Sequence, residues 1–320
     1  MKPSQHKEKI VTAKKVAVAT LLIDLGDVVM IGAISFITGS ALLFAQVLQT
    51  IANIISDIFL LIGLHSAHKH SDKKHPFGYG RELYIWTLFA AVIMFGFTAG
   101  FSMYAGYQRL LSPEPIVNIW IALVVLIISL IFNIYGVKLA VSRMNGELRM
   151  KGFGNIWKKY SRSNYVETKA AFITDLTGSL GAIISFVGLG IFLVTGALWL
   201  DGLGAILIGI VMAIFSFSLI VNIKELLVGR AVSPEVDNQI RLAAERVSGV
   251  RFIGEMTSEN VGLNRLVVDL DISLDQYISV AHAQEIVEKV KDSVIDEVPA
   301  VFYMQVELIP PTDDNINIEE

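Results

Sequence analysis

Six long apolar stretches, interrupted by few polar positions, dominate the chain up to about residue 225. Each is long enough to cross the hydrocarbon core of a bilayer as a helix, which takes about 20 residues. They cover residues 16–38, 42–64, 83–108, 116–141, 166–195 and 199–223. This pattern predicts a polytopic α-helical membrane protein with six transmembrane helices.

The pattern changes to shorter periods after residue 225. Apolar residues recur at helical spacing from about 233 to 247 and from 279 to 294, and they alternate in 251–257, 265–273 and 301–308. An α-β-β-α-β order predicts a compact α+β domain. We therefore divide the chain into an N-terminal tail at 1–15, a membrane domain at 16–225, a soluble domain at 226–310 and an acidic tail at 311–320.

Composition supports this division and narrows the function. Hydrophobic residues make up 53% of the 320 residues and charged residues 18%, with a mean hydropathy of +0.59. The chain has no cysteine, which rules out disulfides, thiolate metal sites and thiol catalysis. We also find no Gly-rich phosphate loop, nucleophile elbow or His-Glu-x-x-His motif, so we expect neither an enzyme nor a nucleic-acid partner.

Basic residues are distributed unevenly between the connections. The N-terminal tail, the connection after the second span and the connection after the fourth are rich in lysine and arginine, whereas the opposite connections hold Arg109 alone. Because basic loops stay on the cytoplasmic side, both termini are predicted to be cytoplasmic. A bacterial inner membrane is the expected location.

Four aspartates interrupt the apolar spans: Asp24, Asp27, Asp57 and Asp175. A charged side chain at mid-membrane costs about 3 kcal/mol, so such residues usually line a polar path or a binding site. Some of them could instead lie at helix ends or be neutral and hydrogen-bonded between helices. Together they predict a transporter.

Short motifs along the chain carry a resemblance to a known family. The motifs are residues 75–82 (His-Pro-Phe-Gly-Tyr-Gly-Arg-Glu), 39–42 (Gly-Ser-Ala-Leu), 199–201 (Trp-Leu-Asp), 230–235 (Arg-Ala-Val-Ser-Pro-Glu) and 281–283 (Ala-His-Ala). In this order they resemble the cation diffusion facilitators, which export divalent metal ions, usually zinc, in exchange for protons. Residues 226–235 and 112–115 look most similar to a divergent branch that includes the mitochondrial zinc transporter 9 of animals.

The resemblance implies a homodimer with ferredoxin-like cytoplasmic domains and a transport site between the second and fifth spans. Family members place His/Asp-x-x-x-Asp on each of these spans. The matching positions here are Gln49 and Asn53 on the second span and Ala171 and Asp175 on the fifth. Only Asp175 keeps the family's residue type, and Gln49 and Asn53 could simply bond between helices.

Three further aspartates could replace the missing ligands. Asp57 continues the helical face of Gln49 and Asn53, and Asp24 and Asp27 lie one turn apart on the first span. An all-oxygen site suits manganese or iron(II) better than zinc, with cobalt and zinc still possible. Alternatives are transport of sodium or an organic cation by the same carboxylates, or a non-transporting sensor or scaffold.

The loop after the second span offers a second candidate metal site. Its residues are His68, His70, Asp72 and His75, with Tyr79 where relatives have a third ligand. A basic loop facing anionic lipid explains the same segment equally well.

Two further expectations concern the soluble domain and its junction. Arg81 and Glu225 are candidates for the charge pair that locks the helices across the dimer in relatives. We expect the domain itself to dimerise with weak or no metal binding. Gly254, Asp271 and Glu307 stand where relatives often have histidines, and His282 alone is retained.

Overall fold

A computed structural model describes residues 3–69, 71–147, 156–157, 160, 166–262 and 265–310. Its contacts divide into two compact units. One is a helical unit of residues 11–68 and 82–224. The other contains the first turns of the N-terminal helix, residues 69–81 and the chain from Glu225 onward.

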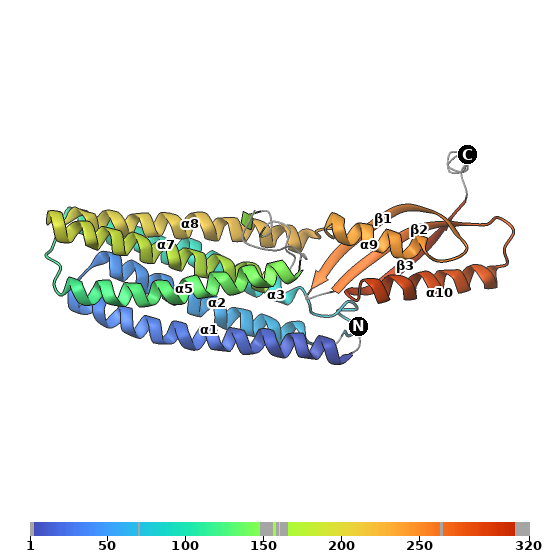
Figure 1. Ribbon diagram of the computed structural model, residues 1–320, viewed down its shortest axis with the longest axis horizontal. Helices are drawn as coiled ribbons and strands as arrows, with labels where there is room; N and C mark the ends of the chain where they lie inside the picture. The colour runs from blue at the N-terminus through green and yellow to red at the C-terminus, as the bar shows by residue number, and fades with distance from the viewer. Residues whose placement is uncertain are drawn as a thin grey trace. The chain divides into compact units, whose positions relative to one another are not determined.

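Long helices form the first unit (Figure 1). They are α1 (Pro3–Thr38), α2 (Ala41–Ala67), α3 (Glu82–Ile93), α4 (Ala99–Leu111), α5 (Ile119–Glu147), α7 (Val166–Thr195) and α8 (Trp199–Val228). A π-helical turn, Met94–Thr98, joins α3 to α4, so these two form one span. In the described part of the chain, six helices are long and apolar enough to cross a membrane, as the sequence predicted.

The N-terminal helix is longer than its apolar stretch. We expected a tail over residues 1–15, but α1 already begins at Pro3, and its membrane candidate segment is Thr20–Thr38. A proline in the first helical turn is tolerated because the amides there have no intrahelical partner. At its other end, Gly39 adopts a φ of +66°, which stops the helix and lets Ser40 cap α2.

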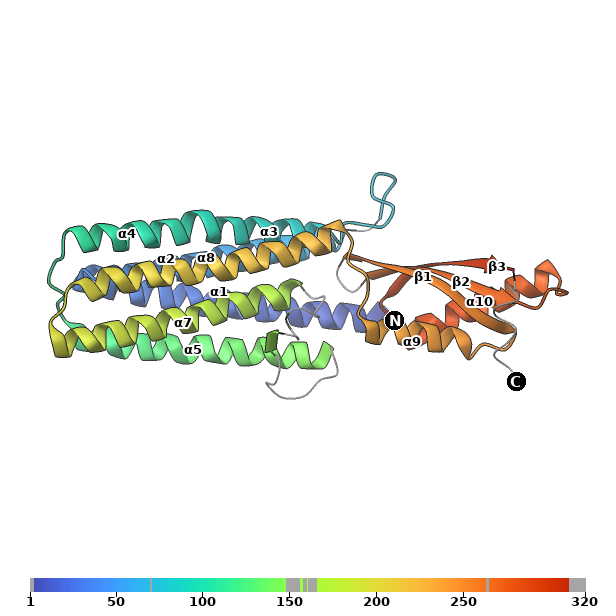
Figure 2. The same ribbon diagram turned by 90° about the horizontal axis from the view of Figure 1, so that it is seen from above.

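The helices pack around a core of small and aliphatic side chains. Leu42, Leu43, Leu126, Leu189 and Met212 are among its fully buried members. Helices α5 and α7 run side by side in Figures 1 and 2 and make extensive contact. Helix α2 contacts both α4 and α7, so its polar face lies inside the bundle.

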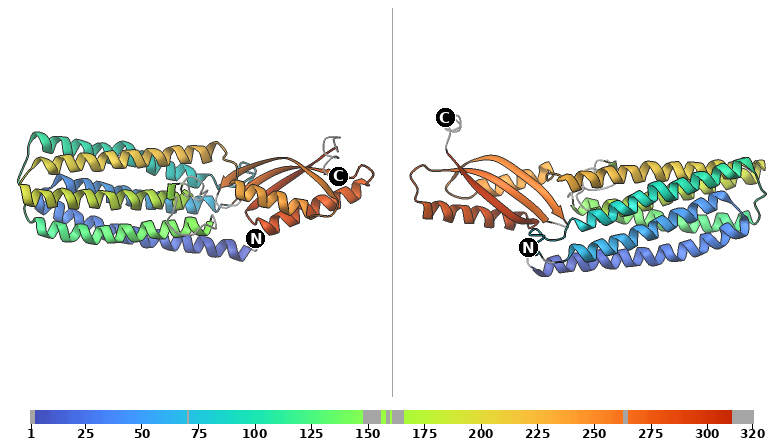
Figure 3. Two further views of the ribbon diagram at one scale, coloured as in Figure 1. Left: turned by 45° about the horizontal axis from the view of Figure 1, so that its top comes forward. Right: turned by 180° about the vertical axis from the view of Figure 1, so that it is seen from behind.

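The second unit contains a small α/β fold. Its elements are α9 (Pro234–Glu245), β1 (Val250–Gly262), β2 (Arg265–Leu274), α10 (Val280–Glu297) and β3 (Val301–Ile309). Strands β1 and β2 pair antiparallel, and β3 pairs with β2 in parallel after the α10 crossover. Both helices cover one face of the three-stranded sheet (Figure 3).

Alternating residues of β2 supply the centre of this fold, as their period predicted. Val268, Leu270 and Ile272 are fully buried against Val290 and Val294 of α10. Strand β1 runs further than the 251–257 expected, because its pairing with β2 continues through Asn260 and Gly262.

Candidate cation site

The aspartates predicted from the sequence gather inside the helical unit. Asp24 of α1 lies within electrostatic range of Asp57 on α2, Asp175 on α7 and its own neighbour Asp27. We call Asp24, Asp57 and Asp175 the acidic group. These three side chains are half-buried, and Thr20 forms a hydrogen bond with Asp57.

A glycine of α5 forms one wall of the acidic group. A Cβ atom on Gly136 would lie only 2.4 Å from a carboxylate oxygen of Asp175. No other residue fits at that position without displacing the carboxylate, because real Cβ atoms do not approach so closely. The α5 backbone therefore helps to fix where Asp175 lies.

The fourth aspartate has different neighbours. Asp27 is 5% exposed and accepts a hydrogen bond from the Ser129 hydroxyl of α5 over 2.9 Å. The Thr50 hydroxyl of α2 also forms a hydrogen bond with Asp27. Asn133, one turn from Ser129, donates to the Ser129 carbonyl over 2.9 Å.

Carboxamides of α2 complete this second set. Gln49 and Asn53 are 1% and 5% exposed. On the facing α7, a Cβ on Gly181 would lie 2.4 Å from Gln49 Oε1, and one on Gly178 would lie 1.8 Å from Asn133 Oδ1. The two glycines thus let amide oxygens lie directly on the α7 backbone. We call Asp27, Gln49, Thr50, Ser129 and Asn133 the hydroxyl–amide group.

The two groups lie at different depths in the bundle. Along α1, Asp27 is nearer than Asp24 to the end where α1 turns into α2. Along α2, Gln49 is nearer than Asp57 to that same end, and along α5, Ser129 is nearer than Gly136. The acidic group therefore forms one layer, the hydroxyl–amide group the next, and Asn53 lies between them on α2.

The structure places all six residues predicted for transport on α1, α2 and α7 of the helical unit: Asp24, Asp27, Gln49, Asn53, Asp57 and Asp175. Their role as ligands stays a prediction. No group of three or more carboxylate or histidine side chains among the described residues is close enough to hold a metal ion. Amide or hydroxyl oxygens, or a movement of the helices, must therefore complete any coordination shell.

Sequence reasoning overlooked the contribution of α5. Ser129 and Asn133 stand four residues apart, with Gly136 one turn further, inside an otherwise apolar span. This spacing places polar side chains on one helical face and was a usable signal.

A buried lysine was also overlooked. Lys169 of α7 is fully buried, lies 3.1 Å from Asn222 Oδ1 and stacks on Tyr160. Burial raises the pKa of Tyr160 to about 12, so this phenol remains protonated.

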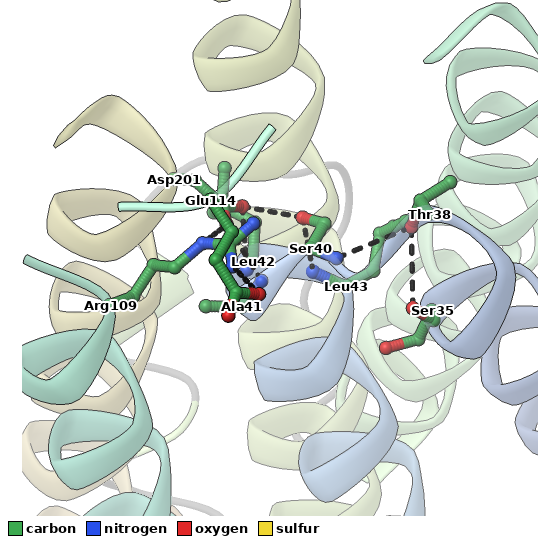
Figure 4. Close-up of polar contacts among 9 residues, drawn as sticks. All are labelled: Ser35, Thr38, Ser40, Ala41, Leu42, Leu43, Arg109, Glu114 and Asp201. Carbon is green, nitrogen blue, oxygen red and sulfur yellow. Dashed lines mark hydrogen bonds and ion pairs between the residues drawn. The ribbon is translucent and has the colours of Figure 1, made fainter. Parts of the chain in front are cut away.

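A third buried constellation joins helices at the α1–α2 turn (Figure 4). Asp201, at the start of α8, is 1% exposed and accepts from the amides of Ala41 and Leu42 over 2.8 and 3.1 Å. It also accepts from the Ser40 hydroxyl and from Arg109 Nε over 2.5 and 2.8 Å. A carboxylate is favourable at the N-terminus of α2, where amides are unpaired and the helix dipole is positive. The sequence motifs at 39–42 and 199–201 thus meet in one network.

The loop after α2 uses its aspartate to hold its own shape. Asp72 accepts from the amides of Lys74 and His75 over 2.9 and 2.7 Å and from the Tyr79 hydroxyl over 2.8 Å. The Tyr79 bond, followed by the His75 amide, lowers the pKa of Asp72. His75 stacks on Tyr79 with ring centres 4.2 Å apart.

The predicted loop metal site gains no support from this arrangement. His68 ends α2 and contacts the Leu64 carbonyl through its ring, and His70 lies outside the described residues. The loop site stays a prediction for the remaining residues.

Within the single chain, Arg81 and Glu225 each have another partner. Arg81 pairs with Glu259 of β1, whereas Glu225 lies 3.8 Å from Arg230. The reason is a close backbone contact, since a Cβ on Gly262 would lie 2.4 Å from the Gly80 Cα. This contact places Arg81 beside β1 within the chain, and the pair of Arg81 and Glu225 across a dimer stays a prediction.

Comparisons with known proteins agree with this architecture. The family model of the cation efflux transmembrane domain matches residues 17–228, and that of the cation efflux protein cytoplasmic domain matches residues 232–308.

Three curated relatives illustrate the range of similarity. The human mitochondrial proton-coupled zinc antiporter SLC30A9 is 28% identical over 74% of this chain, and the match spans only 42% of that protein's length. The magnetosome protein MamB of Magnetospira sp. is 24% identical over 90% of this chain and 92% of the relative. The metal cation efflux system protein CzcD of Cupriavidus metallidurans is 29% identical over 54% of this chain and 48% of its own.

Among solved structures, a variant of the C-terminal cytoplasmic domain of MamM is 31% identical over 24% of this chain and 94% of its own, with a TM-score of 0.24. The two family models together span nearly the whole chain, including the residues of the acidic group and of the hydroxyl–amide group. The chain belongs to the cation efflux family, the cation diffusion facilitators, as its motifs indicated.

Proposed function

We propose that this protein exports a divalent metal cation across a membrane in exchange for protons. The observation that carries the proposal is the acidic group, which sets carboxylates from α1, α2 and α7 within electrostatic range of one another inside the bundle. Carboxylates in a membrane interior need a proton or a cation to offset their charge. Exchange of one for the other is the chemistry that such a group can perform.

The chemistry of the side chains favours a hard or borderline cation. Asp175 and Asp57 supply carboxylate oxygens, and Asn53, one turn from Asp57, supplies an amide oxygen. Oxygen ligands of this kind suit manganese and iron(II), with zinc and cobalt bound less strongly. Two ionised carboxylates balance the charge of one divalent ion.

A cycle of alternating access follows from these properties. A metal ion that enters from the cytoplasmic side displaces protons from the acidic group. The helices then expose the group to the opposite side, where protons return to the carboxylates and release the metal. Positive charge on the connections after the second and fourth spans supports the assignment of that side of the bundle to the cytoplasm.

The family assignment of residues 232–308 supports a homodimer built on the cytoplasmic domain. In this arrangement, each chain has its own acidic group, and the cytoplasmic domains hold the two chains together. Membrane lipid, metal ions and protons are the remaining partners.

Uptake of metal into liposomes tests the proposal. The purified chain is reconstituted with a proton gradient, and uptake of zinc, manganese, iron(II) and cobalt is measured beside Asp175→Asn. Loss of a ligand should reduce uptake about tenfold or more, since even ligand-supporting residues contribute that much to metal affinity. The matched control is Glu285→Gln, an exposed carboxylate of α10 that should leave uptake unchanged. Wild-type rates in folded Asp175→Asn would contradict the proposal.

Transport of sodium or an organic cation by the same carboxylates is the second candidate. The observation that favours it is the replacement of the family's ligand positions by Gln49 and Ala171, which leaves no nitrogen ligand on either span. Proton coupling that persists without any divalent metal would favour it.

A further inference from the structure

A partly open cavity of about 720 Å³ lies at the end of the helical unit where α1 turns into α2. Its walls come from α1, α2 and α4 and from the connection that follows α4. The distribution of basic residues predicts that this end faces away from the cytoplasm. The described lining contains no member of the acidic group or of the hydroxyl–amide group, so the cavity is separate from the proposed transport site.

The lining of the cavity changes from polar to apolar with depth. Arg109 lies in the last turn of α4, and Glu114 lies just beyond that helix. Phe44 and Val47 lie one and two turns inside the span of α2, so the apolar part reaches roughly 10 Å from the helix end. Apart from Ser35, the deeper lining residues are glycine or apolar. A phospholipid has the same gradient, because its charged headgroup lies above apolar chains.

A buried guanidinium in the cavity wall has an unused donor. The Arg109 side chain is 8% exposed; its Nε donates to Asp201 over 2.8 Å and its Nη1 to Glu114 over 3.0 Å (Figure 4). Its Nη2 has no hydrogen-bond partner among the described residues. Buried donors normally have a partner, and a phosphate oxygen is a preferred partner of a guanidinium.

The charges around the cavity indicate which headgroup fits. Arg109 carries one positive charge, whereas Asp201 and Glu114 carry one negative charge each. A headgroup that is only anionic would meet this excess of negative charge, but a phosphate that carries its own ammonium group would not. The Glu114 side chain is 73% exposed, which leaves its carboxylate accessible to that ammonium group.

We propose that the cavity binds the headgroup of phosphatidylethanolamine, with the phosphate at Arg109 Nη2, the ammonium group at Glu114 and the start of the acyl chains against Phe44 and Val47. A primary ammonium group can donate hydrogen bonds to a carboxylate, whereas the quaternary group of phosphatidylcholine has no N–H. The proposal concerns lipid binding alone and does not depend on the transported ion.

The bound lipid would stabilise the end of the bundle. Arg109 joins α4 to α8 through Asp201, and Asp201 accepts from the first amides of α2. A phosphate at Nη2 would complete the hydrogen bonds of this guanidinium. The lipid is therefore a structural ligand of the junction between α2, α4 and α8.

Native mass spectrometry of the full-length protein in detergent tests the proposal. The protein is titrated with phosphatidylethanolamine and with phosphatidylcholine that has the same acyl chains, so the two lipids differ only in the ammonium group. The wild-type protein should bind phosphatidylethanolamine about fivefold more tightly, since an exposed ion pair contributes about that much. The preference should fall below about twofold in Glu114→Gln and persist in Glu285→Gln, an exposed carboxylate of α10.

A second pair of variants tests the place of binding. A Cβ on Gly32 or on Gly26 of α1 meets nothing within 4 Å, so leucine is tolerated at both positions. Gly32 lines the cavity, whereas Gly26 is not among its lining residues. Gly32→Leu should fill the cavity and weaken phosphatidylethanolamine binding about tenfold, and Gly26→Leu should leave it unchanged.

Several results would overturn the proposal. They are equal affinity of the wild-type protein for the two lipids, a preference that survives in Glu114→Gln, and unchanged binding by folded Gly32→Leu. Phosphatidylglycerol that binds more tightly than phosphatidylethanolamine would also overturn it, because an anionic lipid gains nothing from Glu114.

Discussion

The Nε atom of Arg109 lies 2.8 Å from a carboxylate oxygen of Asp201, and both side chains are buried. This pair joins the end of α4 to the start of α8, and Asp201 also holds the first amides of α2. Three helices are therefore fixed to one another beside the α1–α2 turn. The acidic group and the hydroxyl–amide group lie further along α2. The network at Asp201 therefore fixes the end of α2 from which the helix runs toward both groups.

Removing Asp201 should destabilise the protein far more than removing its neighbour Glu114. Asp201→Ala leaves the buried Arg109 with only the exposed Glu114 as its charged partner, which costs about 3–5 kcal/mol, and it also uncaps α2. Glu114 lies 3.0 Å from the same arginine, but its side chain is 73% exposed, so Glu114→Ala should cost at most about 1 kcal/mol. Thermal unfolding in detergent compares the two. Equal losses of Tm would mean that burial does not decide the strength of this network.

A methyl group at Gly136 should impair transport. The Cβ of Gly136→Ala would collide with the Asp175 carboxylate and force it out of the acidic group. We expect metal uptake in liposomes to fall about tenfold or more. Gly190→Ala on α7 is the control, because a Cβ there meets nothing within 4 Å and alanine favours a helix. Normal uptake by Gly136→Ala would show that the position of Asp175 is not critical.

Restoring the family's ligand types should change the preferred metal. The double variant Gln49→His and Ala171→Asp adds an imidazole and a carboxylate to the spans that carry Asn53 and Asp175. Imidazole favours zinc over manganese, so competition assays should show zinc gaining on manganese about tenfold or more. The neutral change Ala171→Ser provides the control. An unchanged preference would place the divalent site elsewhere.

The loop after α2 should keep its shape at neutral pH through Asp72. Hydrogen bonds in the folded loop lower the pKa of Asp72 below its ordinary 3.8. The contribution of this carboxylate is therefore fully present above about pH 4 and is lost only as the pH falls through the lower folded-state value. Trypsin cleavage at Lys73 and Lys74, corrected for enzyme activity, should not vary between about pH 6 and 8 and should rise in Asp72→Ala. A wild-type loop that opens across this pH range would contradict a shape held by the Asp72 carboxylate.

The sequence predicted the helices and strands well because their periods report burial directly. The membrane spans and the alternation of Leu266 to Ile272 in β2 follow from which faces avoid water. The start of α1 at Pro3 could not be found this way, since residues 3–15 carry no apolar stretch to mark a helix.

The candidate site was only partly predictable. A charged side chain inside an apolar span costs free energy, so an aspartate there indicates a functional role. The sequence therefore identified Asp24, Asp27, Asp57 and Asp175 as candidates. Ser129 and Asn133 are neutral, and burying them costs little free energy once they are hydrogen-bonded. Their presence in an apolar span is therefore weaker evidence of a functional site. The partner of Arg81 depends on the approach of Gly80 to Gly262, residues far apart in the chain, and no local pattern reports such a contact.

The most direct test of the account measures metal and proton movement together. Liposomes that contain the protein and a pH-sensitive dye receive external manganese without an imposed proton gradient. The account predicts that manganese entry is accompanied by proton exit, and that both vanish in Asp175→Asn but not in Glu285→Gln. Manganese entry with no change in internal pH, or a pH change that survives in Asp175→Asn, would contradict exchange at the acidic group.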